Sequence, residues 1–281
     1  MAGSSMKDIK LRIKSVESTM QITKAMQLVA TSKLRRAKER MENSKPYAAI
    51  SREAIRAAVL SCEDKTVPFV AVRPLKRRLY VIVAGERGLA GGYNNNVFKA
   101  VAAHSEGVDY CVLPLGRKAI EKYHRLGVEL LSEEYPRVEH VSVGRSYQLA
   151  QLVIDGYLAE RYDEVWLCYT AFRSMMSQEV QLEQLLPVPQ PESEEAPAPT
   201  AVYELDAAET LQRVMPDFLA GRIYSALCDS FASDVSSRRM AMDSATKNAG
   251  AMISDLTLKY NRARQGAITQ EITEIVAGAE E

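Results

Sequence analysis

Residues 6–43 read MKDIKLRIKSVESTMQITKAMQLVATSKLRRAKERMEN, and this stretch without Gly or Pro decides the fold of the chain. Its apolar and small residues recur in alternating steps of three and four, the spacing of a coiled-coil seam. The seam consists of Ile9, Ile13, Val16, Met20, Thr23, Gln27, Ala30, Leu34, Ala37 and Met41. Thr23 and Gln27 are polar breaks, and a second stripe of Ile22, Met26 and Val29 widens the apolar face beside them. The pattern predicts a long helix that needs more than one neighbour in its middle.

Helical periodicity returns from about Ala207 to the end of the chain, after early interruptions at Pro216 and Gly221. The expected seam is Val235, Arg238, Met242, Ala245, Ala249, Met252, Leu256, Lys259 and Ala263. Helices of these lengths would reach roughly 80 Å and 100 Å, too long to fold back inside one globule. Because a narrow stripe is marginal alone, we expect the two ends to pair as antiparallel helices. Pro46 is expected to kink the first helix, or to start a second segment that runs to about Leu60.

The middle of the chain changes to strand-like patterns at residues 79–84, 108–113 and 164–170, with helical stretches between them near 92–103, 116–126 and 145–161. This alternation predicts a small parallel, Rossmann-like α/β domain. A short strand at 127–131 and an edge strand within 175–188 are further candidates. Residues 187–199 hold five prolines and three glutamates, typical of an extended acidic linker. The expected division is therefore 1–60 for the first helix, 77–188 for the α/β domain, 189–206 for the linker and 207–281 for the last helix.

The charge is balanced overall but unevenly distributed. The chain of 281 residues has 36 basic and 36 acidic side chains, whereas residues 1–45 have eleven basic and four acidic ones. A basic arm on a neutral protein indicates an acidic partner surface. Four widely separated cysteines, Cys62, Cys111, Cys168 and Cys228, suggest buried reduced thiols rather than a metal site. No apolar run has the length of a membrane span, and no signal peptide is expected.

Three features could carry small-molecule chemistry, and each has a plainer interpretation. The glycine-rich loop Gly85–Asn94 follows a strand and could hold a phosphate, but it matches neither phosphate-loop pattern, so a structural turn is favoured. The basic run Lys33–Arg40 could bind nucleic acid, but it lacks interleaved aromatic residues and better fits a solvated face or an acidic protein. The histidines, at 104, 124 and 140, lie in unrelated segments. We therefore expect no catalytic residue, no cofactor and no metal.

The most specific stretch is Ile268–Ala279, ITQEITEIVAGA, whose apolar residues at 268, 272, 275, 276 and 279 share one helical face. Glu271 and Glu274 lie one turn apart on another face, where an ion pair with a neighbouring helix is favoured over acid–base catalysis. This stretch resembles the C-terminal signature of the γ subunit of F-type ATP synthases. Residues 21–36, 258–265 and the motifs Arg87-Gly88-Leu89 and Gly91–Asn94 resemble the same family. Arg239, Gly85, Glu86 and Ala90 depart from its usual residues.

The resemblance implies a rotor stalk of the bacterial type, without catalytic residues of its own, coupled to ion flow. In that family the paired helices enter the α3β3 ring, and the α/β domain lies at the foot with the ε subunit and the membrane c-ring. It implies contacts with α3β3 at Met26, Arg264, Gln265 and Glu271, and contacts with the c-ring at Tyr203, Glu204 and Leu205. It also implies a peripheral location on the cytoplasmic side of the cell membrane, without insertion into it. The small C-terminal residues 276–279 would suit a turning bearing.

Two alternatives remain from the residues alone. One is a small α/β nucleotide-binding enzyme with helical arms, which nucleotide binding by the isolated chain would favour. The other is a coiled-coil scaffold or nucleic-acid adaptor, which strongly salt-dependent DNA binding would favour. The γ-subunit interpretation predicts neither activity, and it predicts no nucleic-acid partner.

Overall fold

A computed structural model describes residues 6–62, 64, 66–132, 134, 137–189 and 206–279. The chain forms two compact units, Met1–Thr31 with Arg238–Glu281, and Ser32–Ser237. Both long helices, α1 (Met6–Ser61) and α5 (Ala207–Ala279), contribute residues to each unit. We call the first the distal unit and the second the sheet unit, and describe each by itself.

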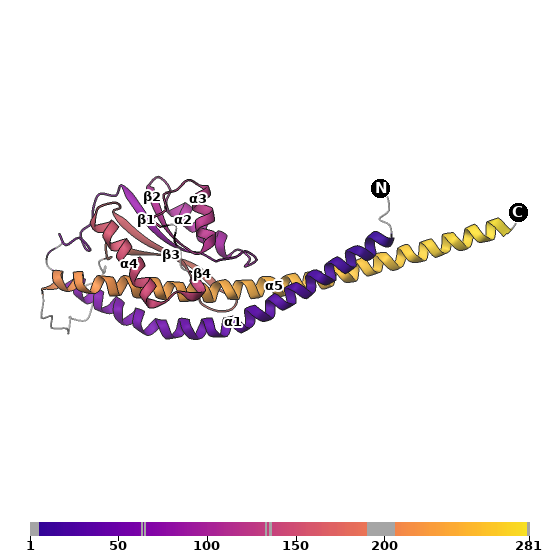
Figure 1. Ribbon diagram of the computed structural model, residues 1–281, viewed down its shortest axis with the longest axis horizontal. Coiled ribbons are helices and arrows are strands. Elements are labelled where there is room, and N and C mark those ends of the chain that lie inside the picture. Colours follow the sequence, from indigo (N-terminus) through magenta and orange to yellow (C-terminus); the bar gives the residue numbers. More distant parts are fainter. Residues whose placement is uncertain are drawn as a thin grey trace. The chain divides into compact units, whose positions relative to one another are not determined.

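The sheet unit is built on four strands in the order β2-β1-β3-β4 (Figure 1). β1 (Arg77–Val83), β2 (Asp109–Leu115) and β3 (Glu164–Phe172) are parallel, as the alternating pattern predicted. β4 (Gln178–Leu186) is the expected edge strand and pairs antiparallel with β3, so the sheet is mixed rather than wholly parallel. A tight turn at residues 173–177 explains the antiparallel direction, because parallel neighbours need a long crossover. The candidate strand at 127–131 contributes only a single bridge, between Val112 and Leu130.

One face of the sheet is covered by α2 (Tyr93–His104) and α3 (Arg117–Arg125). Alternate residues of β1, Tyr80 and Ile82, are completely buried there. They belong to a core with Val97 and Val101 of α2 and with Tyr123 of α3. Burial of successive residues on both faces explains why the strand is a continuous apolar run rather than an alternating one.

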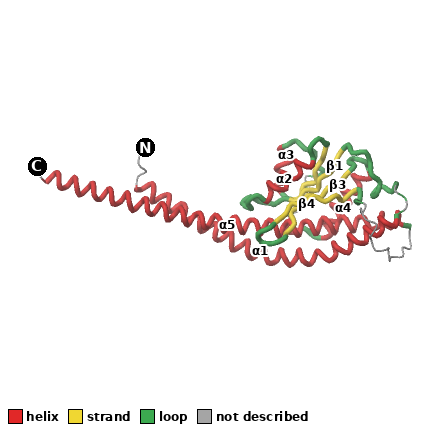
Figure 2. Tube along the Cα trace, turned by 180° about the vertical axis from the view of Figure 1, so that it is seen from behind, coloured by secondary structure: helices red, strands yellow, loops and turns green. Residues whose placement is uncertain are grey.

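The other face is covered by α4 (Val143–Leu158) and by the parts of α1 and α5 that lie in the sheet unit (Figure 2). Leu79, Val81 and Val83 of β1 point to this side and share the larger core with residues from all three helices. A short 3-10 turn, η1 (Val138–His140), precedes α4, which begins at the cap Ser142, where the hydroxyl accepts a hydrogen bond from the Arg145 N–H. Segments of both long helices, α1 and α5, therefore form part of the core of the sheet unit.

Both long helices are continuous through the residues expected to interrupt them. Pro46 lies inside α1, and α5 continues through Pro216 and Gly221. Gly221 has a packing role, because a Cβ there would come within 2.5 Å of the Tyr47 ring on α1. The glycine thus allows the two helices to approach closely, and packing against the sheet compensates for its weak helix propensity.

The distal unit is an antiparallel pair formed by residues 6–31 of α1 and residues 238–279 of α5. Contacts pair Thr23 with Thr246 and Gln27 with Asp243, so one helix advances as the other recedes. The predicted α1 seam is confirmed, because each of its residues in this unit is buried or half-buried. The α5 seam was wrong at Met252 and Lys259, which are exposed, while Ile253 and Tyr260 occupy the inner positions. Leu256 and Ala263 are half-buried as predicted, so the inner face keeps its seven-residue repeat and only the alternate position of each repeat lies one residue further along.

Candidate partner-binding surfaces

The polar break in the distal seam is satisfied across the helix pair. The hydroxyl oxygens of Thr23 and Thr246 are 2.8 Å apart, and Gln27 Nε2 donates to Asp243 Oδ1 over 2.9 Å. Lys247 and then Gln27 hold the pKa of the Asp243 carboxyl below its usual value. One turn further along, Arg239 Nε donates to Thr31 Oγ1 over 3.1 Å. Polar pairs at matched positions fix the register of two helices more tightly than apolar contacts do.

Met26 lies beside this polar break and is half-buried. Its neighbours in the second stripe, Ile22 and Val29, each remain 58% exposed. The structure therefore brings the three predicted residues together on one helix face, where Met26 is partly covered and Ile22 and Val29 are exposed. An exposed apolar stripe of this kind is characteristic of a surface that a partner covers.

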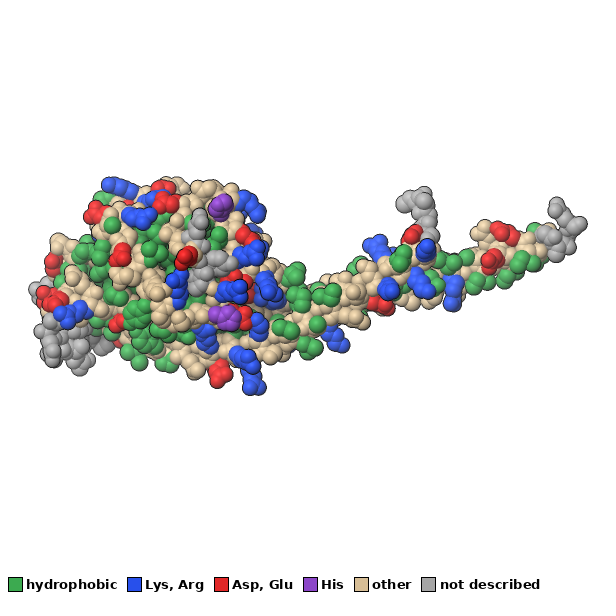
Figure 3. Space-filling model, in the orientation of Figure 1, with side chains coloured by type: hydrophobic (Ala, Val, Ile, Leu, Met, Phe, Trp, Pro, Cys, Tyr) green, Lys and Arg blue, Asp and Glu red, His purple; other side chains and the backbone are tan. Residues whose placement is uncertain are grey.

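The C-terminal end of α5 continues past the beginning of α1 (Figure 1). Arg264, Gln265 and Glu271 are all exposed on this single helix. The apolar residues of the predicted face are exposed too: Ile268 by 47%, Ile272 by 56%, Ile275 by 70% and Val276 by 56%. Figure 3 shows hydrophobic side chains gathered along one side of this end and acidic side chains elsewhere on it. Without a partner surface, such a helix would expose its most hydrophobic face to water.

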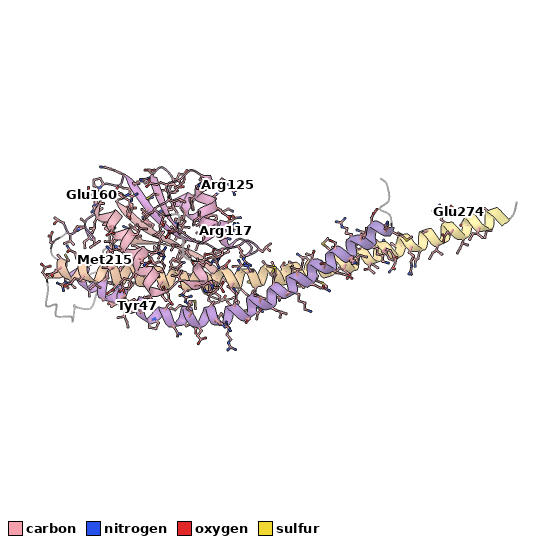
Figure 4. All side chains as sticks on the ribbon, viewed as in Figure 1. Tyr47, Arg117, Arg125, Glu160, Met215 and Glu274 are labelled. Carbon is pink, nitrogen blue, oxygen red and sulfur yellow. The ribbon has the colours of Figure 1, made fainter. Side chains whose placement is uncertain are left out.

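The two glutamates of this end do not form the ion pair that we favoured. Glu274 lies on the C-terminal turns of α5 (Figure 4) and accepts a hydrogen bond from Gln270 Nε2 over 2.9 Å. Its partner is thus one turn back on its own helix. The ion pairs of the described residues in this part of α5 are Lys247–Asp243 and Lys259–Asp255, and neither includes Glu271 or Glu274.

The expected foot residues Tyr203, Glu204 and Leu205, and most of the proline-rich segment, lie outside the described residues. Their predicted contact with a c-ring remains a prediction.

The glycine-rich loop is a closed structural turn. Asn94 Oδ1 accepts a hydrogen bond from the Gly85 N–H over 2.8 Å, and Leu89 and Gly91 adopt positive φ values of 63° and 57°. A Cβ on Gly85 would lie 3.1 Å from the carboxylate oxygen Asp234 Oδ1 of α5. A carboxylate at that position repels a phosphate, so the turn interpretation is favoured on electrostatic grounds.

The basic run of α1 is partly committed to the sheet unit. Arg40 donates to the carbonyl oxygens of Glu139 and Val141 and to the hydroxyl of Tyr224. Lys38 lies 5.0 Å from the centre of the Phe172 ring, and Arg35 and Arg36 remain exposed. The sequence did not indicate these contacts, because they join residues about a hundred or more positions apart. One side of this basic run therefore packs against other residues of the sheet unit, and its other side faces solvent.

The cysteines and histidines considered as candidate chemical groups do not come together in one site among the described residues. The four cysteines are free and buried, as expected, and the described residues contain no group of three or more potential metal ligands. Burial raises the pKa of Cys168 to about 12 and that of Cys111 to about 11, so both remain protonated thiols. His104 is half-buried beside Trp166, with Nδ1 2.7 Å from the Tyr80 hydroxyl oxygen. None of the helices in the described part of the chain combines the length and apolarity that a bilayer crossing requires.

This fold and these surfaces define a class of protein: a small α/β domain completed by two long terminal helices whose far ends present apolar faces to a partner. A family model described as ATP synthase matches residues 5–281. The chain belongs to the ATP synthase gamma chain family. It is 42% identical to the gamma chain of Geobacter metallireducens over 289 residues, which covers 99% of this chain and 98% of the relative. The gamma chain of Ruminococcus albus is 41% identical, covering 97% and 96%.

Solved structures share the fold at much lower identity. The Euglena gracilis mitochondrial ATP synthase rotor aligns with a TM-score of 0.68 and 15% identity, covering 94% of this chain and 98% of that one. The central stalk and c-ring structure from Tetrahymena thermophila aligns with a TM-score of 0.60 and 23% identity, covering 80% and 99%. The fold resemblance suspected from the two ends is thus confirmed along nearly the whole chain.

Proposed function

We propose that this chain is the central rotor stalk of an F-type ATP synthase. In this role it transmits rotation of a membrane c-ring to the catalytic β subunits and so couples ion flow to ATP synthesis or hydrolysis. The observation that carries the proposal is the exposed apolar face at residues 268–276, on a chain that belongs to the gamma chain family along its whole length. Such a face fits insertion into a ring of partner subunits, because only burial by a partner offsets its contact with water.

The proposal assigns no catalytic residue to this chain. Its partners are the α, β and ε subunits and the c-ring, and it requires neither nucleic acid nor a cofactor. The chain lies peripherally on the cytoplasmic side of the cell membrane, with membrane attachment supplied by the c-ring. The enzyme alternative is disfavoured because the Gly85 N–H of the glycine-rich loop donates to the Asn94 side chain, and the Asp234 carboxylate lies beside Gly85.

Contacts are proposed by position along the chain. Met26, Arg264, Gln265 and Glu271 contact α3β3, supported by their place on or beside the exposed apolar faces of the distal unit. Residues 203–205 contact the c-ring. The functional segments are 1–60 and 207–281 for the shaft, 77–188 for the α/β domain and 189–206 for the linker.

Co-expression with tagged β subunit and with α and ε tests the proposal. We expect this chain to co-purify in a stable complex and to raise the ATPase activity of α3β3. A chain that stays monomeric and leaves that activity unchanged contradicts it. Nucleotide turnover by the chain alone would support the enzyme alternative, and salt-dependent DNA binding would support the scaffold alternative.

A further inference from the structure

A cationic cavity opens in the sheet unit between α1, β4 and α5. Its volume is about 910 Å³, within the usual range for small-ligand sites. Five basic side chains line it: Lys45, Arg52, Arg56, Arg173 and Arg222. Only two carboxylates, Glu183 and Asp229, share the lining. A third carboxylate, Glu179, pairs with Arg173 over 3.0 Å, so five basic groups face three acidic ones on a chain that is neutral overall.

The floor of this cavity is fixed by a buried ion pair. The Arg222 side chain is 4% exposed and holds Glu183 through both of its carboxylate oxygens. Arg52 lies 3.7 Å from the same carboxylate and keeps 59% of its side chain exposed. The Glu183 carboxylate thus pairs with two guanidinium groups. The exposed guanidinium of Arg52 retains further N–H donors.

Arg56 adds a donor without a partner. Its Nε is buried, and among the described residues no atom accepts a hydrogen bond from it. That nitrogen is closed off from solvent, so only the terminal guanidinium nitrogens of Arg56 are available to a ligand in the cavity. Asp229 of α5, which also lines the cavity, does not accept a hydrogen bond from the Arg56 Nε. Burial raises its pKa, while Lys45, Arg222 and Arg173 counter the increase.

We propose that this cavity binds a small multivalent phosphate of the pyrophosphate or nucleoside polyphosphate class. Guanidinium groups present a planar fork of donors that matches phosphate oxygens, and they attract a multiply charged anion more strongly than a single carboxylate. Arg52 and Arg56 lie one helical turn apart on α1, so both can contact neighbouring phosphate oxygens. Ile55 and Phe218 in the wall are buried, so the phosphates rather than a base supply the binding energy. The site goes beyond the rotor function and does not depend on it.

Isothermal titration of the full chain with pyrophosphate, at fixed ionic strength, tests the site. We expect saturable binding, with ATP of similar affinity, orthophosphate weaker and adenosine not bound. The double variant Arg52→Gln/Arg56→Gln should weaken pyrophosphate binding about tenfold or more. The matched control Arg117→Gln/Arg213→Gln removes two exposed arginines elsewhere and should leave the affinity unchanged.

Lys45→Gln provides a second, milder variant with an expected loss of several-fold, and thermal melting verifies that each variant is folded. No saturable binding, equal losses in both double variants, or binding of a glutamate-rich peptide as tight as that of pyrophosphate would overturn the assignment. Because the titration uses the chain alone, its failure leaves co-purification with α and β unaffected.

Discussion

Thr23 of α1 and Thr246 of α5 face each other in the distal helix pair with their hydroxyl oxygens 2.8 Å apart. Each hydroxyl is also within hydrogen-bond distance of a carbonyl on its own helix, Met20 for Thr23 and Met242 for Thr246. The pair therefore has three possible bonds for two hydroxyl protons. A polar pair of this kind selects one register at a cost in stability relative to an apolar pair.

Replacing one threonine by valine should cost about 1 kcal/mol, because the remaining hydroxyl loses its cross-helix partner. Replacing both should cost less than the two single changes together, since neither hydroxyl then needs a partner. Urea unfolding of Thr23→Val, Thr246→Val and the double variant measures the coupling. Strictly additive costs would show that the two hydroxyls do not interact.

A second prediction concerns packing of α4 under the sheet. A Cβ on Gly156 would overlap the hydroxyl of Tyr162, whose ring is 1% exposed and whose hydroxyl donates to the Val153 carbonyl over 2.8 Å. Gly156→Ala should therefore lower the unfolding free energy by about 1–3 kcal/mol despite the better helix propensity of alanine. Gly144→Ala, in the same helix with its nearest atom 4.0 Å away, should be neutral or stabilising. Equal effects at the two glycines would contradict the packing argument.

A pH prediction follows from His104. Burial first, and then the charge of Arg78, lower its pKa in the folded chain below the ordinary value of 6.5. The unfolded chain therefore binds the proton more readily, so unfolding free energy should fall as the pH drops below 6.5. His104→Gln should give a shallower decline in denaturant unfolding measured across this range. The exposed His124→Gln serves as control and should keep the wild-type slope.

The apolar end of α5 should matter for assembly but not for folding. Ile272→Glu/Ile275→Glu changes two exposed residues, so the melting temperature of the free chain should stay within a few degrees. Recovery in a complex with α and β should fall strongly, since two carboxylates would be buried against the partner. The control Gln270→Glu/Thr273→Glu adds the same charge away from the apolar face and should assemble normally. Equal recovery of both variants would argue against burial of this face.

Met26→Lys should impair coupling. It places a positive charge on the exposed stripe beside Ile22 and Val29, where we propose contact with β. We expect ATP hydrolysis to continue while proton pumping per ATP decreases in reconstituted vesicles. Unchanged coupling would remove Met26 from the proposed contact.

The sequence predicted those parts of the fold that depend on periodicity. The α1 seam and the strands near 79–84, 108–113 and 164–170 were correct because burial imposes a regular spacing on them. Continuity through Pro46, Pro216 and Gly221 was missed, because tertiary packing of each helix outweighs the local cost of a breaker. The change from Met252 to Ile253 leaves the seven-residue repeat of Ala249, Leu256 and Ala263 intact, because the sequence did not show which of two adjacent apolar residues faces α1.

The surfaces were less accessible to sequence reasoning. The apolar face at 268–276 was visible as a spacing, but its exposure depends on where α1 begins beside it. The cationic cavity was not predicted, because Arg56 and Arg222 are far apart in the chain and each resembles an ordinary surface arginine. Its signal is spatial: five basic side chains from α1, α5 and the loop before β4 line one cavity.

Direct observation of rotation within α3β3 is the sharpest test of the rotor role. A probe attached to the sheet unit, through a cysteine introduced at the exposed Lys122, would be followed in surface-fixed α3β3 complexes during ATP hydrolysis. We expect continuous rotation of the probe in one direction, at a rate that follows ATP turnover. A probe that stays fixed while the same complexes hydrolyse ATP would contradict the rotor role.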